Sequence, residues 1–214
     1  EREDIPDGAR SLVLMGPRRP LSDTALRKLV RFIDQGGNLL LAGEPEYREH
    51  IQPLLDYLGI SLKPGFIVQP APQLGSGRVL GYIHEAAYPL LWRVDSLRRK
   101  YHVHGLPVDT INVALEGAAG LDVSEVKNFA VTPLLHSRVG RSWNVPELRN
   151  PDSLALVLDK KLTDEEGSFP LMVLLHRKVD GKDQRIIVSG DVDFIKRLSY
   201  PKERTSYLEY RSDL

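Results

Sequence analysis

His102 and His104 have the most metal-like spacing in the sequence. Side chains in a strand alternate between its two faces, so His102-Val103-His104 would place both imidazoles on one face. Zinc or copper could bind there if a carboxylate or a third histidine came from elsewhere, and His84-Glu85 is the nearest candidate in sequence. Because no third ligand stands at a diagnostic spacing, we interpret the pair as ordinary surface residues and assign no metal.

Asp191 and Asp193 follow an apolar run at residues 186–188. Open α/β sheets bind ligands where their strands end, so these carboxylates could hold Mg²⁺ or act as an acid and base pair. The alternative is structural: one aspartate caps the next turn, and Phe194 enters the core. We favour the cap, and we keep Asp191 and Asp193 as candidate contacts for a ligand or partner.

A second polar group lies at residues 137–143. Ser137 and Ser142 flank Arg138 and Arg141, and hydroxyls together with guanidinium groups can bind an anion. A solvated loop held by a packed Trp143 is the simpler interpretation. Ser137, Arg138, Arg141 and Trp143 complete the set of candidate contacts.

The composition argues against several classes of function. The 214 residues include no Cys, and 29 Lys+Arg balance 29 Asp+Glu. There is therefore no thiol nucleophile and no thiolate zinc site, and the sequence also lacks the G-x-S-x-G and G-x-x-x-x-G-K-[ST] motifs. Zero net charge disfavours sequence-independent nucleic-acid binding, which needs surplus cations. We expect a protein that is not an enzyme, uses no cofactor and binds no nucleic acid.

The first 60 residues predict a strand–helix–strand unit. Ser11–Met15 and Asn38–Gly43 are short apolar runs typical of buried strands. Between them, Ser22 is a helix N-cap, an apolar stripe follows at helical spacing, and Gly36-Gly37 ends the helix. Such a unit makes a right-handed crossover, so the two strands should pair in parallel.

The rest of the chain predicts a mixed sheet. A second helical pattern spans residues 47–58; either the helix kinks at Pro53, or its regular part starts near Gln52 with Pro53 in the first turn. Residues 61–80 are a loop with a short strand at 66–68. The last third is rich in strands, with an antiparallel hairpin around 180–183. We expect one α/β domain over residues 1–200, a mostly parallel mixed sheet with helices on its faces, and a polar tail at 201–214.

Several segments, taken in order, resemble the GldG-type family of gliding-motility-associated ABC transporter auxiliary proteins. They are Leu12–Pro17, Pro20–Ser22, Phe32–Leu41, Leu54–Ile60, Val131–Ser137 with Ser142-Trp143, and Arg185–Phe194. The resemblance implies an extracytoplasmic domain on the periplasmic or outer face of a bacterial membrane. It also implies transporter permease and ATPase subunits as partners, and membrane anchors outside this sequence.

The same resemblance implies a class I glutamine amidotransferase-like fold, which is a flavodoxin-like three-layer sandwich. That enzyme fold uses a cysteine nucleophile, so the absence of Cys excludes its mechanism here. The longest apolar stretch is about eight residues, well short of the roughly 20 that a spanning helix needs. Because the chain begins at Glu1 rather than Met, we expect it to be a piece of a longer protein.

The leading hypothesis is a non-enzymatic interaction domain of an ABC-type export or gliding-associated complex. Its loops at 61–80 and 136–150 would contact the partner. The alternatives are a domain that binds a glycan, peptide or lipid fragment, and a metal-dependent hydrolase that uses the aspartates or the histidine pair.

Overall fold

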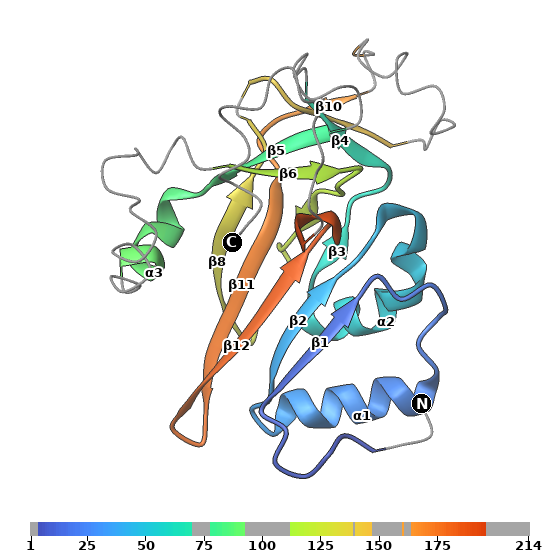
Figure 1. Cartoon of the computed structure of the whole chain (residues 1–214), viewed down its shortest axis with the longest axis vertical. Coiled ribbons are helices and arrows are strands. Elements are labelled where there is room, and N and C mark those ends of the chain that lie inside the picture. The colour runs from blue at the N-terminus through green and yellow to red at the C-terminus, as the bar shows by residue number, and fades with distance from the viewer. Residues whose placement is uncertain are drawn as a thin grey trace.

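The computed structural model describes residues 4–69, 78–92, 112–138, 140–146, 160 and 164–195. A seven-stranded mixed sheet runs through the molecule (Figure 1). Its strands, in spatial order, are β1 (Ser11–Met15), β2 (Asn38–Ala42), β12 (Lys182–Ser189), β11 (Pro170–Val179), β8 (Ala130–His136), β5 (Arg78–Ile83) and β6 (Asn112–Glu116).

The expected crossover unit opens the fold. β1 and β2 are parallel neighbours, and α1 (Asp23–Asp34) connects them. The Ser22 hydroxyl accepts a hydrogen bond from the Ala25 N–H at 3.2 Å and so caps the helix. Leu12 pairs with Leu39, and both pack into the main hydrophobic core. The predicted parallel pair is confirmed.

A second helix, α2 (Arg48–Leu58), follows η1 (Pro45–Tyr47) and contains Pro53. It ends at Gly59, which has a φ of 75°. A side chain there would meet the main-chain carbonyl of Glu125 at 2.5 Å, so both the turn and the close approach require glycine. Leu54 and Leu55 face inward from α2 and are fully buried in the main core.

Parallel pairing is limited to one end of the sheet. β1–β2 and β2–β12 are parallel, whereas the four other neighbouring pairs are antiparallel. The sheet is therefore mixed, as expected, with a smaller parallel share than the sequence analysis proposed. The connections between strands explain this difference. Parallel neighbours need a long crossover connection, whereas β11 and β12 are joined by the two residues Asp180 and Gly181 and must therefore run antiparallel. Both of these turn residues have positive φ, at 49° and 76°.

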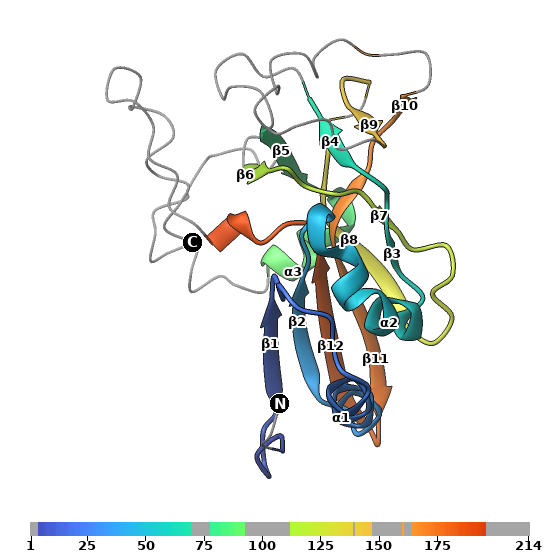
Figure 2. The same ribbon diagram turned by 90° about the vertical axis from the view of Figure 1, so that its right-hand side faces the viewer.

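Shorter elements lie outside the seven-stranded sheet (Figure 2). Two small sheets form, one of β10, β9 and β4 and one of β3 and β7. Their strands are β3 (Ser61–Leu62), β4 (Phe66–Val68), β7 (Leu121–Asp122), β9 (Trp143–Val145) and β10 (Glu165–Glu166). Among the described residues, the remaining helices are η2 (Glu85–Ala87), α3 (Tyr88–Trp92) and η5 (Asp193–Ile195). The predicted strand at residues 66–68 is confirmed as β4.

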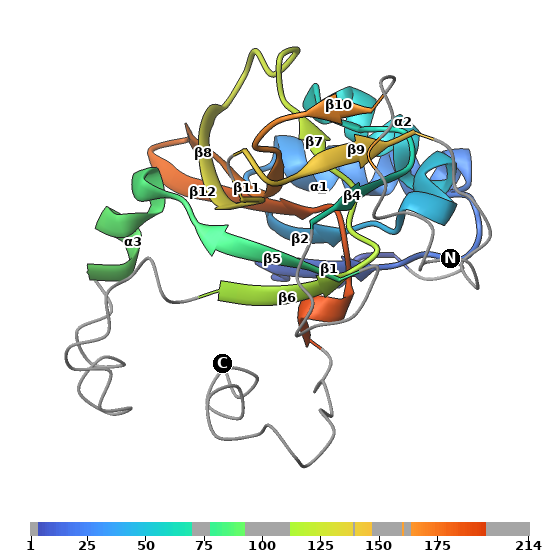
Figure 3. The ribbon, with the colours of Figure 1, turned by 90° about the horizontal axis from the view of Figure 1, so that it is seen from above.

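The layering differs from a symmetric sandwich. Figure 3 shows α1 and α2 on the same side of the sheet. On the opposite face, Val13 of β1 keeps 65% of its surface exposed. The described residues thus supply a helical layer of α1 and α2 on one side only, and the three-layer, amidotransferase-like arrangement is not confirmed. The single domain at residues 1–200 stays a prediction, and the tail at 201–214 lies outside the described residues.

No helix in the described part of the chain is both long and apolar enough to span a membrane.

Candidate functional site

Three carboxylates gather where two neighbouring parallel strands end. Glu44 follows β2, and Asp191 and Asp193 follow β12. Because β2 and β12 pair in parallel, their carboxyl ends emerge side by side. One carboxylate oxygen from each residue lies within 4.8 Å of the others. Asp191 is fully buried, and Asp193 is 7% exposed.

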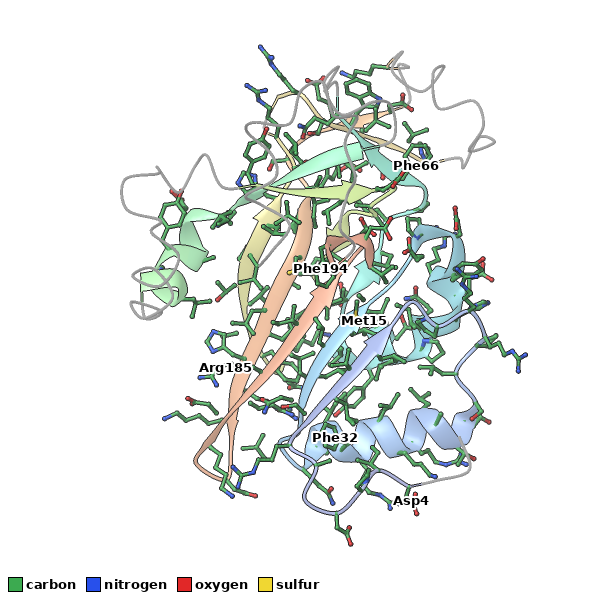
Figure 4. All side chains as sticks on the ribbon, in the orientation of Figure 1. Asp4, Met15, Phe32, Phe66, Arg185 and Phe194 are labelled. Carbon is green, nitrogen blue, oxygen red and sulfur yellow. The ribbon has the colours of Figure 1, made fainter. Side chains whose placement is uncertain are left out.

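Asp191 bonds to the main chain through both of its carboxylate oxygens. Oδ2 accepts from the Glu116 N–H of β6 at 2.8 Å, and Oδ1 accepts from the Asp193 N–H at 2.7 Å. The second of these bonds is the cap that the sequence analysis favoured. It begins η5, from which Phe194 packs against a second core cluster around Leu115 and Leu171 (Figure 4).

Gly190 allows this close arrangement. Its carbonyl accepts from the Ala119 N–H at 2.9 Å, and its N–H donates to the Leu171 carbonyl at 3.0 Å. A Cβ at Gly190 would lie 2.1 Å from the Ala119 carbonyl oxygen. The main chain at the exit of β12 therefore contacts two other segments directly, and only glycine fits.

Burial raises the pKa of Asp191 to about 7. The nearby charges of Asp193 and Glu44 raise this pKa further, whereas the N–H groups of Asp193 and Glu116 oppose the shift by favouring the ionised form. At neutral pH the group can therefore hold or release a proton. Three convergent carboxylates are also the ligand type that Mg²⁺ and Ca²⁺ prefer.

The second predicted group divides into buried and exposed parts. Ser137 is fully buried, and its hydroxyl accepts from the Phe169 N–H at 3.0 Å. The Ser142 hydroxyl donates to the Arg138 carbonyl at 2.9 Å, while the side chains of Arg138 and Arg141 are exposed. Both serine hydroxyls are therefore hydrogen-bonded to main-chain groups. The guanidinium groups of Arg138 and Arg141 remain as the accessible part of the predicted anion site.

Trp143 belongs to a small apolar cluster. It is 7% exposed and packs with Phe66, Val68 and Val145 across the pairing of β4 and β9. This agrees with the interpretation of residues 137–143 as a loop held by a packed tryptophan. Trp143 is therefore part of the scaffold that carries the two arginines.

The structure does not test the hypothesis of a metal site at His102 and His104. His102 and His104 lie in residues 93–111, outside the described residues. His84, whose neighbourhood was the nearest candidate third ligand, accepts from the Ala86 N–H at 3.1 Å and caps η2.

Two half-open cavities lie elsewhere in the molecule. One, of about 480 Å³, is between the end of α2 (residues 56–61) and residues 122–129. The other, of about 560 Å³, lies over β8, β11 and β12 beside Leu90 of α3. None of the six residues nominated from the sequence lines either of these two cavities.

Sequence reasoning missed Glu44. Its one signal was its position directly after a predicted parallel strand, where polar side chains collect at the edge of a sheet. The sequence did not reveal that β12, about 140 residues later, would pair beside β2.

The fold and the site define this protein as an α/β domain. Its candidate reactive side chains, Asp191 and Ser137, are hydrogen-bonded to the main chain of the domain itself. The chain belongs to the family described as ABC-type uncharacterized transport system, whose model matches residues 1–212. It is therefore an auxiliary component of an ABC-type transport system.

The fold has a counterpart among solved structures. The mmIFT52 N-terminal domain superposes with a TM-score of 0.53 at 16% sequence identity, over 86% of this chain and 67% of that chain. Identity at this level shows a shared fold alone. No curated protein matches the chain.

Proposed function

We propose that this domain is a non-enzymatic interaction module of an ABC transport complex, exposed on the extracytoplasmic face of a bacterial membrane. The family match supports a place in a transport system. The observation that carries the non-enzymatic part is Asp191, because both of its oxygens accept main-chain hydrogen bonds. The finer assignment to a GldG-type, gliding-associated system rests on the resemblance of the sequence segments.

The proposed mechanism is docking through the loops around β4 and β9. Arg138 and Arg141 are exposed there, while Ser137, Ser142 and Trp143 fix the surrounding chain. A scaffold that presents two exposed cations suits a partner surface with carboxylates. The permease and ATPase subunits of the same complex are the proposed partners, and the permease is the subunit that a domain on the extracytoplasmic face could contact directly.

Co-purification of the intact membrane protein in mild detergent tests this proposal. We expect a transporter subunit to be recovered, and we expect Arg138→Glu combined with Arg141→Glu to reduce its yield, because charge reversal repels an acidic surface. Lys182→Glu, at the exposed β11–β12 turn, is the matched control. Recovery without any transporter subunit, or equal yields from both variants, contradicts the proposal.

The extracytoplasmic location has its own test. Because the chain lacks Cys, Lys182→Cys introduces a single exposed thiol into it. In intact cells with the outer membrane permeabilised, we expect a membrane-impermeant maleimide to label this thiol. Labelling only after the inner membrane is lysed would place the domain in the cytoplasm.

Two alternative functions have specific structural features behind them. The cavity of about 560 Å³ beside α3 has a size suited to a small ligand. A metal-dependent hydrolase would use Glu44, Asp191 and Asp193, whose oxygens converge. Metal analysis of protein purified without a histidine tag decides the second: less than roughly 0.1 metal per chain removes it, since such a site needs bound metal.

A further inference from the structure

β1 is an edge strand, and within the described residues it hydrogen-bonds only to β2. The Arg10 carbonyl accepts from the Asn38 N–H, and the Gly16 N–H donates to the Ala42 carbonyl. Both residues therefore face β2. Because residues along a parallel strand alternate in the direction of their main-chain groups, Leu12 and Leu14 also face β2. The N–H and C=O groups of Ser11, Val13 and Met15 must then point away from the sheet.

Within the described residues, β1 holds no lysine, proline or bulge at this outer edge. Edge strands commonly hold a lysine, a proline or a bulge that blocks pairing with another chain. The sequence of β1 is SLVLM, without charge or proline, and its register with β2 is continuous. Val13, at its centre, keeps 65% of its surface exposed. The edge can therefore accept another strand.

The pattern of outward groups is self-complementary. In an antiparallel pair, two residues that face each other through their main-chain groups exchange two hydrogen bonds. A two-fold axis at Val13 would pair Val13 with the same residue of a second copy, and Ser11 with Met15 in both directions. These three pairs use every outward N–H and C=O of the strand, about six hydrogen bonds in all.

We propose that β1 is a self-association edge, at which a second copy of this chain pairs antiparallel through Val13. Two seven-stranded sheets would then continue into one another across the two-fold axis. Five residues a side bury less area than a standard interface. Pairing is therefore concentration-dependent and favoured where copies are held close together. This inference goes beyond the proposed function and does not depend on it.

Disulfide trapping tests the register. Because the 214-residue chain has no native Cys, every disulfide must form between the introduced cysteines. Opposed residues of a hydrogen-bonded pair have Cα atoms about 5.5 Å apart, which suits a disulfide. We expect Val13→Cys to form a dimer under mild oxidation. Ser11→Cys alone and Met15→Cys alone should not, because like positions would be about 13 Å apart along the strands. An equimolar mixture of those two variants should cross-link.

The cross-linking pattern decides the proposal. Equal yields from all single variants would mean random collision, and no dimer from Val13→Cys would mean that the edge does not pair. A cross-link from Val13→Cys without one from the mixture would mean another geometry. Each of these three results overturns the proposed register.

Val13→Pro tests the role of the main chain. Proline removes the outward N–H without affecting the β1–β2 ladder, and edge strands tolerate proline at such positions. We expect Val13→Pro to weaken dimerisation at least about tenfold in sedimentation velocity over a concentration series, since two hydrogen bonds are lost across the axis. Val13→Thr, which keeps the N–H and the branched side chain, should dimerise like the wild type. Equal association of all three proteins refutes the proposal, and if Val13→Pro does not fold, the cysteine variants still decide.

Discussion

Ionisation of Asp191 should make the protein less stable as the pH rises from about 4 to about 7. The pKa of Asp191 is about 7 in the folded protein against an ordinary value of 3.8, chiefly because the side chain is buried. Between these two values the folded state holds a proton that the unfolded chain has lost. The free energy of unfolding therefore falls with increasing pH in this window and levels off above about pH 8.

The magnitude follows from the same two values. Each pKa unit corresponds to about 1.4 kcal/mol, so the full difference is about 4 kcal/mol. Asp191→Asn isolates this contribution, because residue 191 then no longer titrates. Urea unfolding of both proteins at several pH values gives the difference in their free energies of unfolding. We expect the wild type to lose stability relative to Asp191→Asn, by up to about 3 kcal/mol between pH 4.5 and 8, because about 1 kcal/mol of the full difference is already lost at pH 4.5.

Asp122 provides a control because its pKa is shifted in the opposite direction. The N–H of Ser124 holds the pKa of Asp122 below its ordinary value, so this side chain is ionised in both states above pH 5. The difference between wild type and Asp122→Asn should be constant from pH 5 to 8. A constant difference for Asp191→Asn as well would refute the reasoning about the buried carboxyl.

Three further substitutions test the packing around the candidate site and the first helix. Gly190→Ala should lower the free energy of unfolding in urea by more than about 3 kcal/mol, because its Cβ would lie 2.1 Å from the Ala119 carbonyl oxygen. Gly167→Ala, whose Cβ would make only ordinary contacts at 3.6 Å and beyond, should lower it by less than about 1 kcal/mol. Equal losses in the two variants would contradict the close approach at Gly190. Ser137→Ala leaves a buried main-chain N–H without its acceptor and should cost about 1–3 kcal/mol, so an unchanged midpoint would remove the assigned role. Ser22→Ala removes the cap of α1 and should cost about 1 kcal/mol by thermal unfolding, whereas Ser22→Asp should restore most of it.

The first crossover unit could be predicted because its signals are local. Ser22 begins the helix, Gly36 ends it with a φ of 86°, and the two apolar runs are each one strand long. Asp180 and Gly181 likewise have the residue types that a two-residue turn between antiparallel strands demands. In each case a few neighbouring residues determine the conformation.

The arrangement of the sheet depended on contacts that no local pattern records. β12 lies between β2 and β11, so residues 147 positions apart, such as Leu39 and Ile186, pair directly. Apolar runs of similar length are interchangeable in sequence, and nothing in them says which will be neighbours. Glu44 therefore stayed unnoticed, although Asp191 and Asp193 were singled out. The same limit applies to the layers, because a helix can be read from its periodicity while the face that it covers cannot.

The exit of β12 also decides how the domain would respond to a mechanical load. The chain leaves the sheet through Ser189 and Gly190, and the two hydrogen bonds of Asp191 secure it to β6 and to the start of η5. Tension applied to the polypeptide after Ile195 would reach the sheet through residues 189–191 and these two hydrogen bonds. Because the pKa of Asp191 is about 7, the side chain that makes both of these bonds changes its protonation state with small changes of pH around neutrality.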